Sequence, residues 1–135
     1  MRNGALVFAG ISGCIAVMLG ALGAHALTNK VEAGMLNPKS LHAYETAVHY
    51  QMIHTLAIIA LLAIKDKYPA YNKTVTTLFM IGIILFSGSI YALVAGDLTG
   101  VNLKIFGPVT PVGGLCFIAG WFILILTAIK NKEIQ

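Results

Sequence analysis

The middle of the chain reads LHAYETAVHYQMIHTLAIIALLAI from Leu41 to Ile64, where a polar, titratable segment runs directly into an almost wholly apolar one. Three of the four histidines and one of the five acids lie in its first part. His42, Glu45 and His49 have the spacing i, i+3 and i+7, which places them on one face of a helix. Because polar groups are costly at membrane depth, the stretch predicts a membrane helix whose polar side chains need partners.

The composition favours a protein that faces lipid. The 135 residues are 58% hydrophobic and 10% charged, whereas soluble domains carry about 25% charged residues. The mean hydropathy is +0.84. A net charge of +4 without a basic block gives no support to nucleic-acid binding. Cys14 and Cys116 lie inside apolar runs without metal-ligand spacing, which is typical of small core residues.

Four apolar runs predict one domain over residues 1–135, an all-α integral membrane bundle of four transmembrane helices. About 20 apolar residues cross the hydrocarbon. The first run is longer than the apolar part of a signal peptide, which has about 7–15 residues. The expected helices are about residues 4–27, 38–64, 74–95 and 108–129, with loops at 28–37, 65–73 and 96–107.

The second helix is expected to extend beyond the hydrocarbon. Asn37 suits an N-cap and Pro38 suits the first helical position, so the helix should begin at Pro38. Residues 38–64 would measure about 40 Å at 1.5 Å per residue, against a hydrocarbon thickness of about 30 Å. The first turns of this helix should therefore lie in the outer interface.

Lysine and arginine placement predicts the orientation. Six of these residues lie on the side that holds both termini and three lie on the other side. The positive-inside rule then places both termini in the cytoplasm. The expected location is the inner (plasma) membrane of a bacterial cell, which the chain crosses several times.

The first helix carries a face of small residues at spacings of three and four: Ala9, Gly13, Ala16, Gly20 and Ala24. Small residues let transmembrane backbones approach closely. This face predicts that the first helix packs centrally within its own bundle; a dimer face is the alternative.

Polar residues from all four helices are expected to converge near the outer end of the bundle. The ten candidate side chains are His25, His42, Glu45, His49, Tyr50, His54, Ser87, Ser89, Tyr91 and Thr110. One interpretation is a hydrogen-bonded layer that fixes helix register, because buried polar groups need partners. A small ligand or cofactor pocket is another, since intramembrane ionisable groups are functional candidates, and a protein-docking surface is a third. Glu45 is expected to be buried and paired with His25 or His49.

Four motifs in this polar region carry a family resemblance. They are GALGAHAL at 20–27, ETAVHYQMIH at 45–54, LFSGSIY at 85–91, and TPVGG at 110–114 followed by Gly120-Trp121. With these motifs the chain resembles the domain-of-unknown-function family 423, whose animal relatives are called transmembrane protein 256. The resemblance covers nearly the whole chain in the expected order. It implies a four-span integral membrane protein and implies no activity.

Three functions remain open. The first is a non-enzymatic accessory or structural subunit of a larger inner-membrane complex, whose partners are the lipid bilayer and other membrane subunits or a second copy. The second is a small-molecule or cofactor-binding module, in which histidines hold haem or a quinone. The third is a small-solute or proton carrier that works as a homo-oligomer, although no internal repeat supports it.

An enzyme is not expected, because the sequence contains no nucleophile–base motif. A metal site is not expected either, because His42, Glu45 and His49 offer only three candidate ligands without a clear fourth. The sequence identifies no cofactor.

Overall fold

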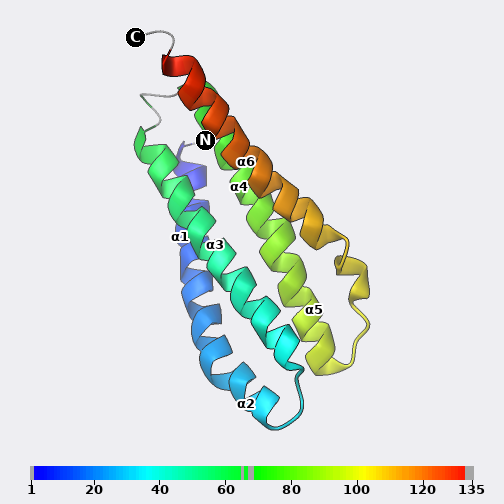
Figure 1. The fold of residues 1–135 in the computed structure, drawn as a ribbon. Coiled ribbons are helices and arrows are strands. Elements are labelled where there is room, and N and C mark those ends of the chain that lie inside the picture. The colour runs from blue at the N-terminus through cyan, green and yellow to red at the C-terminus, as the bar shows by residue number, and fades with distance from the viewer. Residues whose placement is uncertain (1, 65, 67–68, 133–135) are drawn as a thin grey trace.

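The computed structural model describes residues 2–64, 66 and 69–132, and the regular elements within them are all helical (Figure 1). Four helical stretches are long and apolar enough to cross a membrane, which confirms the predicted all-α bundle of four membrane-spanning helices. The spans are Gly4–Glu32, Pro38–Ile64, Asn72–Thr99 and Lys104–Lys130. They run side by side, with the start of the first span and the end of the fourth at the same end of the bundle (Figure 1).

The first span is a helix with a wider turn inside it. It consists of α1 (Arg2–Leu22), the π-helical segment η1 (Gly23–Leu27) and α2 (Thr28–Glu32). The expected end near residue 27 is therefore wrong, because the apolar pattern ends there while the helical backbone continues. The Thr28 hydroxyl donates to the Gly23 carbonyl at 3.1 Å and so holds the chain in the helix across the wide turn.

The second span, α3 (Pro38–Ile64), begins and ends at the predicted residues. Its start is fixed by the expected cap, since the Asn37 side-chain oxygen accepts the Lys39 N–H at 2.9 Å. Gly34 precedes it in a left-handed turn with φ of 71°, a conformation that glycine adopts without strain. α3 lies in the middle of the bundle, with α1 on one side and the third span on the other (Figure 1).

The third span is longer than predicted at both ends. It comprises α4 (Pro69–Gly82), a second π-helical segment η2 (Ile83–Ser87) and α5 (Gly88–Thr99). The helix begins at Pro69 because proline is well suited to a first helical position. It ends where Gly100 takes a left-handed φ of 73°. The 3-10 turn η3 (Lys104–Phe106) then leads into α6 (Val109–Lys132).

α1 packs against α3 through its small residues, but it does not lie at the centre of the bundle. Ala9 and Ala16 are each only 1% exposed. A Cβ at Gly13 or Gly20 would stand 3.6 Å from an α3 side chain, an ordinary contact distance. The predicted central position is wrong, since α1 packs chiefly on α3 and lies at the edge of the bundle.

Among the glycines, the closest approach to another helix's backbone lies between the third and fourth spans. A Cβ at Gly113 of α6 would overlap the Phe86 backbone nitrogen and stand 2.8 Å from the Leu85 carbonyl carbon. Cβ atoms at Gly82 and Gly120 would each come within 2.5 Å of a phenylalanine ring on the facing helix. Glycine thus lets α6 lie directly on η2 and α4.

Candidate functional site

The structure divides the ten candidate side chains into two groups. One group is buried or partly buried between the helices: His54, Ser87, Ser89, Tyr91 and Thr110. The other lies on the surface of the chain: His25, His42, Glu45, His49 and Tyr50. The ten side chains therefore do not share one environment, although Tyr50 packs beside His54 with ring centroids 5.9 Å apart.

Gln51 is the centre of the interior hydrogen-bond network and is only 4% exposed. Its amide nitrogen donates to the Ser12 carbonyl at 2.9 Å, and its amide oxygen accepts the Tyr91 hydroxyl at 2.7 Å. The Ser12 and Thr55 hydroxyls are hydrogen-bonded to each other at 2.7 Å. This network joins the first, second and third spans and fixes their relative depth.

Sequence reasoning did not single out Ser12, Gln51 or Thr55 as candidates. A signal was available, because Gln51 and Thr55 lie one turn apart on the face of α3 that also holds His54 and Ile58, which are buried as well. Uncharged polar residues at helical spacing inside an apolar span are typical of interhelical hydrogen bonding.

His54 is held as a neutral imidazole. Its Nδ1 lies 2.8 Å from the Tyr50 carbonyl, which can only accept, so Nδ1 carries the proton. Its Nε2 accepts the Trp121 indole N–H at 3.1 Å and therefore carries none. The ring stacks on Phe117 with centroids 3.6 Å apart, and Phe79 meets it edge-on. Trp121, which was not among the candidates, thus fixes the tautomer.

Ser87 and Ser89 of the third span form hydrogen bonds to the neighbouring helices. The Ser87 hydroxyl, at the end of η2, donates to the Ala47 carbonyl of α3 at 2.8 Å. The Ser89 and Thr110 hydroxyls are hydrogen-bonded at 2.7 Å and join α5 to α6. Within the described part of the chain, every buried side-chain nitrogen or oxygen has a hydrogen-bond partner. The interior group therefore forms the hydrogen-bonded layer that was one of the three interpretations.

Glu45 lies on the surface, and no hydrogen bond or ion pair joins it to another described residue. The prediction that it is buried against His25 or His49 is wrong. The inward face of α3 is set by Tyr44, Ala47 and Gln51, and one residue further along the helix points about 100° away. Glu45 therefore turns outward, together with His42 and His49.

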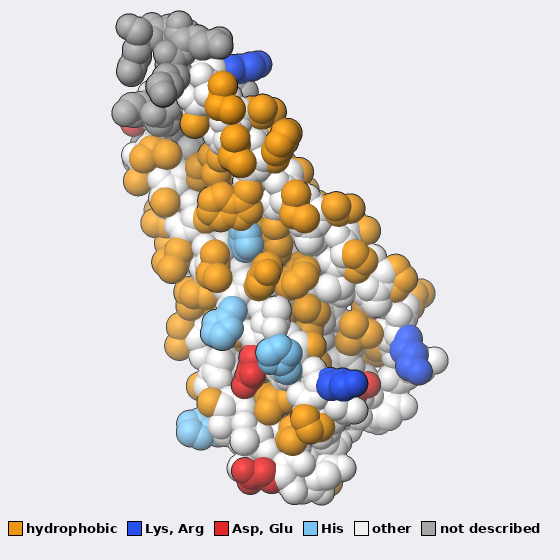
Figure 2. All heavy atoms as spheres, viewed as in Figure 1, with side chains coloured by type: hydrophobic (Ala, Val, Ile, Leu, Met, Phe, Trp, Pro, Cys, Tyr) orange, Lys and Arg blue, Asp and Glu red, His pale blue; other side chains and the backbone are white. Residues whose placement is uncertain are grey.

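Glu45 and His49 line a groove of about 210 Å³ between α3 and the first span. Its floor is made by Gly20, Gly23 and Ala24, which carry at most one methyl group as a side chain. In Figure 2 most of the visible histidine and acidic side chains lie in the lower half of a face that is otherwise largely hydrophobic. Among the described residues, no group of three His, Cys, Asp or Glu side chains could hold a metal ion.

Comparison with known proteins places this chain in a family. A family model described as "Protein of unknown function (DUF423)" matches residues 19–114, which include all ten candidate side chains. The chain belongs to the DUF423 family. It is a multi-pass membrane protein, with four helices long and apolar enough to span the bilayer.

Relatives of this DUF423 protein are named UPF0382 membrane proteins. It is 38% identical to the UPF0382 inner membrane protein YgdD of Escherichia coli, over 95% of this chain and 91% of the relative. It is 38% identical to a UPF0382 membrane protein of Haemophilus influenzae, over 99% of this chain and all of the relative. The UPF0382 membrane protein YwdK of Bacillus subtilis is 34% identical, over 93% and 95%. No solved structure matches the chain.

Proposed function

We propose that this protein is a non-enzymatic accessory subunit of a larger inner-membrane complex, oriented with both termini in the cytoplasm. The face of α3 that carries His42, Glu45 and His49, together with the adjoining groove, binds another membrane protein. The proposal rests on the position of Glu45. This acid lies on the surface of a membrane-spanning helix and has no hydrogen-bond or ion-pair partner among the described residues.

The position of Glu45 makes a partner favourable. It lies seven residues after Pro38, about 10 Å along the helix at 1.5 Å per residue. A charged residue at the bilayer centre costs about 2.5–3.5 kcal/mol, and less nearer the surface. A neighbouring subunit that brings a lysine, arginine or hydroxyl to Glu45 removes part of this cost and gains a charge-assisted hydrogen bond.

The floor of the groove suits a helix as the occupant. Gly20, Gly23 and Ala24 form a small-residue surface on the first span, and small residues allow a second transmembrane helix to approach closely. The interior offers less to a ligand, because its polar groups are already hydrogen-bonded to one another. Haem ligation by His54 would require breaking its bond to Trp121.

Photo-crosslinking in cells tests the proposal. A photoreactive amino acid in place of Ala24, at the groove, should crosslink to one other membrane protein, identified by mass spectrometry. Glu45→Gln should lower the yield several-fold. The purified Glu45→Gln protein should keep its melting temperature, since the carboxylate makes no bond inside the described chain.

The matched control replaces Ile118, a 65% exposed residue on α6, with the same photoreactive group and should give no such product. Crosslinking only to a second copy would contradict the accessory role and favour a homo-oligomeric carrier. Absence of any Glu45-dependent product would also overturn the proposal, and a haem or quinone in the purified protein would favour the cofactor alternative.

A further inference from the structure

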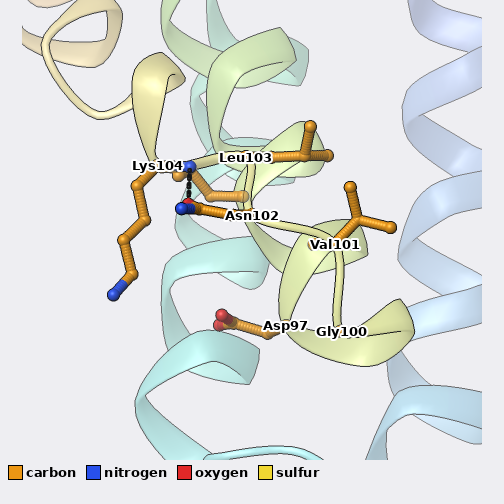
Figure 3. A pocket seen from close by; sticks show the side chains of 8 residues that line it. Asp97, Gly100, Val101, Asn102, Leu103 and Lys104 are labelled. Carbon is orange, nitrogen blue, oxygen red and sulfur yellow. Dashed lines mark hydrogen bonds between the residues drawn. The ribbon is translucent and has the colours of Figure 1, made fainter.

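A second cavity lies where the third span ends and the fourth begins. It has a volume of about 430 Å³ and is bounded by the last turns of α5 and by the connection to η3. Asp97, Asn102 and Lys104 are its polar lining residues, and they point to one side of the connection, away from Val101 and Leu103 (Figure 3). None of these residues belongs to the groove beside Glu45.

One wall of this cavity is negative. The Asp97 carboxylate accepts the Ser40 hydroxyl at 2.6 Å through one oxygen, and a carboxylate offers about four acceptor positions in all. α5 ends two residues later, at Thr99, and the last carbonyls of a helix carry partial negative charge. This wall therefore favours an ammonium group that donates hydrogen bonds.

The cavity lining also carries one positive charge. Lys104 is exposed, and its ammonium contacts no acceptor among the described residues. Its backbone N–H donates to the Asn102 side-chain oxygen at 3.2 Å, drawn as a dashed line in Figure 3, which holds the turn in shape. With Asp97 and Lys104 together, the cavity presents one negative and one positive group, so a ligand of complementary charge is a zwitterion.

The location of the cavity indicates where the ligand comes from. It lies where the span Asn72–Thr99 ends and the span Lys104–Lys130 begins, so a bilayer that both spans cross has this cavity near its surface. Ile105, next to Lys104, is 79% exposed, and Val101 is 56% exposed. Large apolar side chains exposed beside a lysine at this level are typical of a segment that dips into the bilayer interface. The zwitterionic ligand available at this level of the bilayer is a phospholipid headgroup.

We propose that this cavity binds a zwitterionic phospholipid whose headgroup ends in a primary ammonium. The ammonium donates to Asp97 and to the end of α5, and the phosphate accepts from Lys104. A choline headgroup lacks N–H donors, and a glycerol headgroup lacks the cation, so neither completes both contacts. The lipid site shares no residue with the proposed partner-binding face, so the lipid proposal is independent of the partner proposal.

Lipid binding to the full-length protein tests this site. Delipidated protein in detergent is titrated with short-chain phosphatidylethanolamine, phosphatidylcholine and phosphatidylglycerol, and binding is followed by native mass spectrometry. The ethanolamine lipid should bind tightest. Asp97→Asn keeps an acceptor for Ser40 but loses the charge, and should weaken that lipid about three- to tenfold and remove the preference.

Lys104→Gln should weaken all three lipids, because each has a phosphate. The matched control is Lys39→Gln, a lysine outside the cavity that is also exposed, and it should leave binding unchanged. Melting temperatures without lipid verify that the variants are folded. Equal binding of the three lipids, or an equal loss in the Lys39 variant, would overturn the proposal. Soluble phosphoethanolamine that binds as tightly as the lipid would overturn the assignment to the bilayer.

Discussion

Gly113→Ala should be among the most destabilising single-methyl changes in the bundle. The new Cβ would overlap the Phe86 backbone nitrogen and stand 2.8 Å from the Leu85 carbonyl carbon, where ordinary contact begins at 3.4 Å. These are backbone atoms of η2, so no side chain can rotate out of the way. The third and fourth spans would have to separate, and the Ser89–Thr110 hydrogen bond at 2.7 Å joins them close by.

The magnitude follows from two costs and one opposing gain. Overpacking at a closely packed contact costs about 1–3 kcal/mol, occasionally more, and a lengthened interhelical hydrogen bond in a membrane adds about 0.6 kcal/mol. Alanine recovers up to about 1 kcal/mol over glycine in a helix. We expect a net loss of about 2 kcal/mol in the free energy of unfolding.

Gly114→Ala is the matched control, since its Cβ would meet the Phe86 ring at 3.8 Å, an ordinary contact. That variant should be as stable as the parent or slightly more stable. Unfolding in mixed micelles can be followed by the fluorescence of Trp121, the single tryptophan of the chain. Equal stability of the two alanine variants would refute the close backbone contact.

Two further changes test the interior and the orientation. Trp121→Phe removes the donor to His54 Nε2 and leaves a buried acceptor unpaired, so it should lower the free energy of unfolding by about 1 kcal/mol, measured by circular dichroism; no change would count against the bond. In a variant free of native cysteines, Ile105→Cys should react with a membrane-impermeant maleimide in intact cells, and Lys73→Cys should not. The reverse labelling would place the termini outside.

The span count, and much of the span boundaries, could be predicted because they follow from local chemistry. The Asn37-Pro38 start of α3 is a cap signal, and the structure has it. The extension of the first span to Glu32 could not be predicted from hydropathy. The apolar pattern ends near residue 27, whereas the backbone hydrogen bonds of the helix continue through α2. The π-helical segments were not foreseen either, since a single wide turn leaves no residue pattern of its own.

The site was predicted less well, because helical spacing gives shared faces but not the direction in which a face points. The grouping of His42, Glu45 and His49 on one face is confirmed, yet the face points outward. Its direction depends on tertiary packing, in particular on the Tyr44 hydroxyl that donates to the Leu19 carbonyl at 2.8 Å. A pairing between residues 25 positions apart in the sequence is not visible to periodicity.

The tautomer of His54 has an electrical consequence. None of the carboxylate or ammonium side chains whose burial is described is buried, and the one buried imidazole among the described residues is neutral. A transmembrane voltage acts on each unit charge by about 2.3 kcal/mol per 100 mV. Because the core of the described residues holds no such charge, the membrane potential does almost no work when these core side chains rearrange. Any response of the described bundle to voltage must arise at charged groups on its surface, of which Lys39 and Glu45 lie within α3.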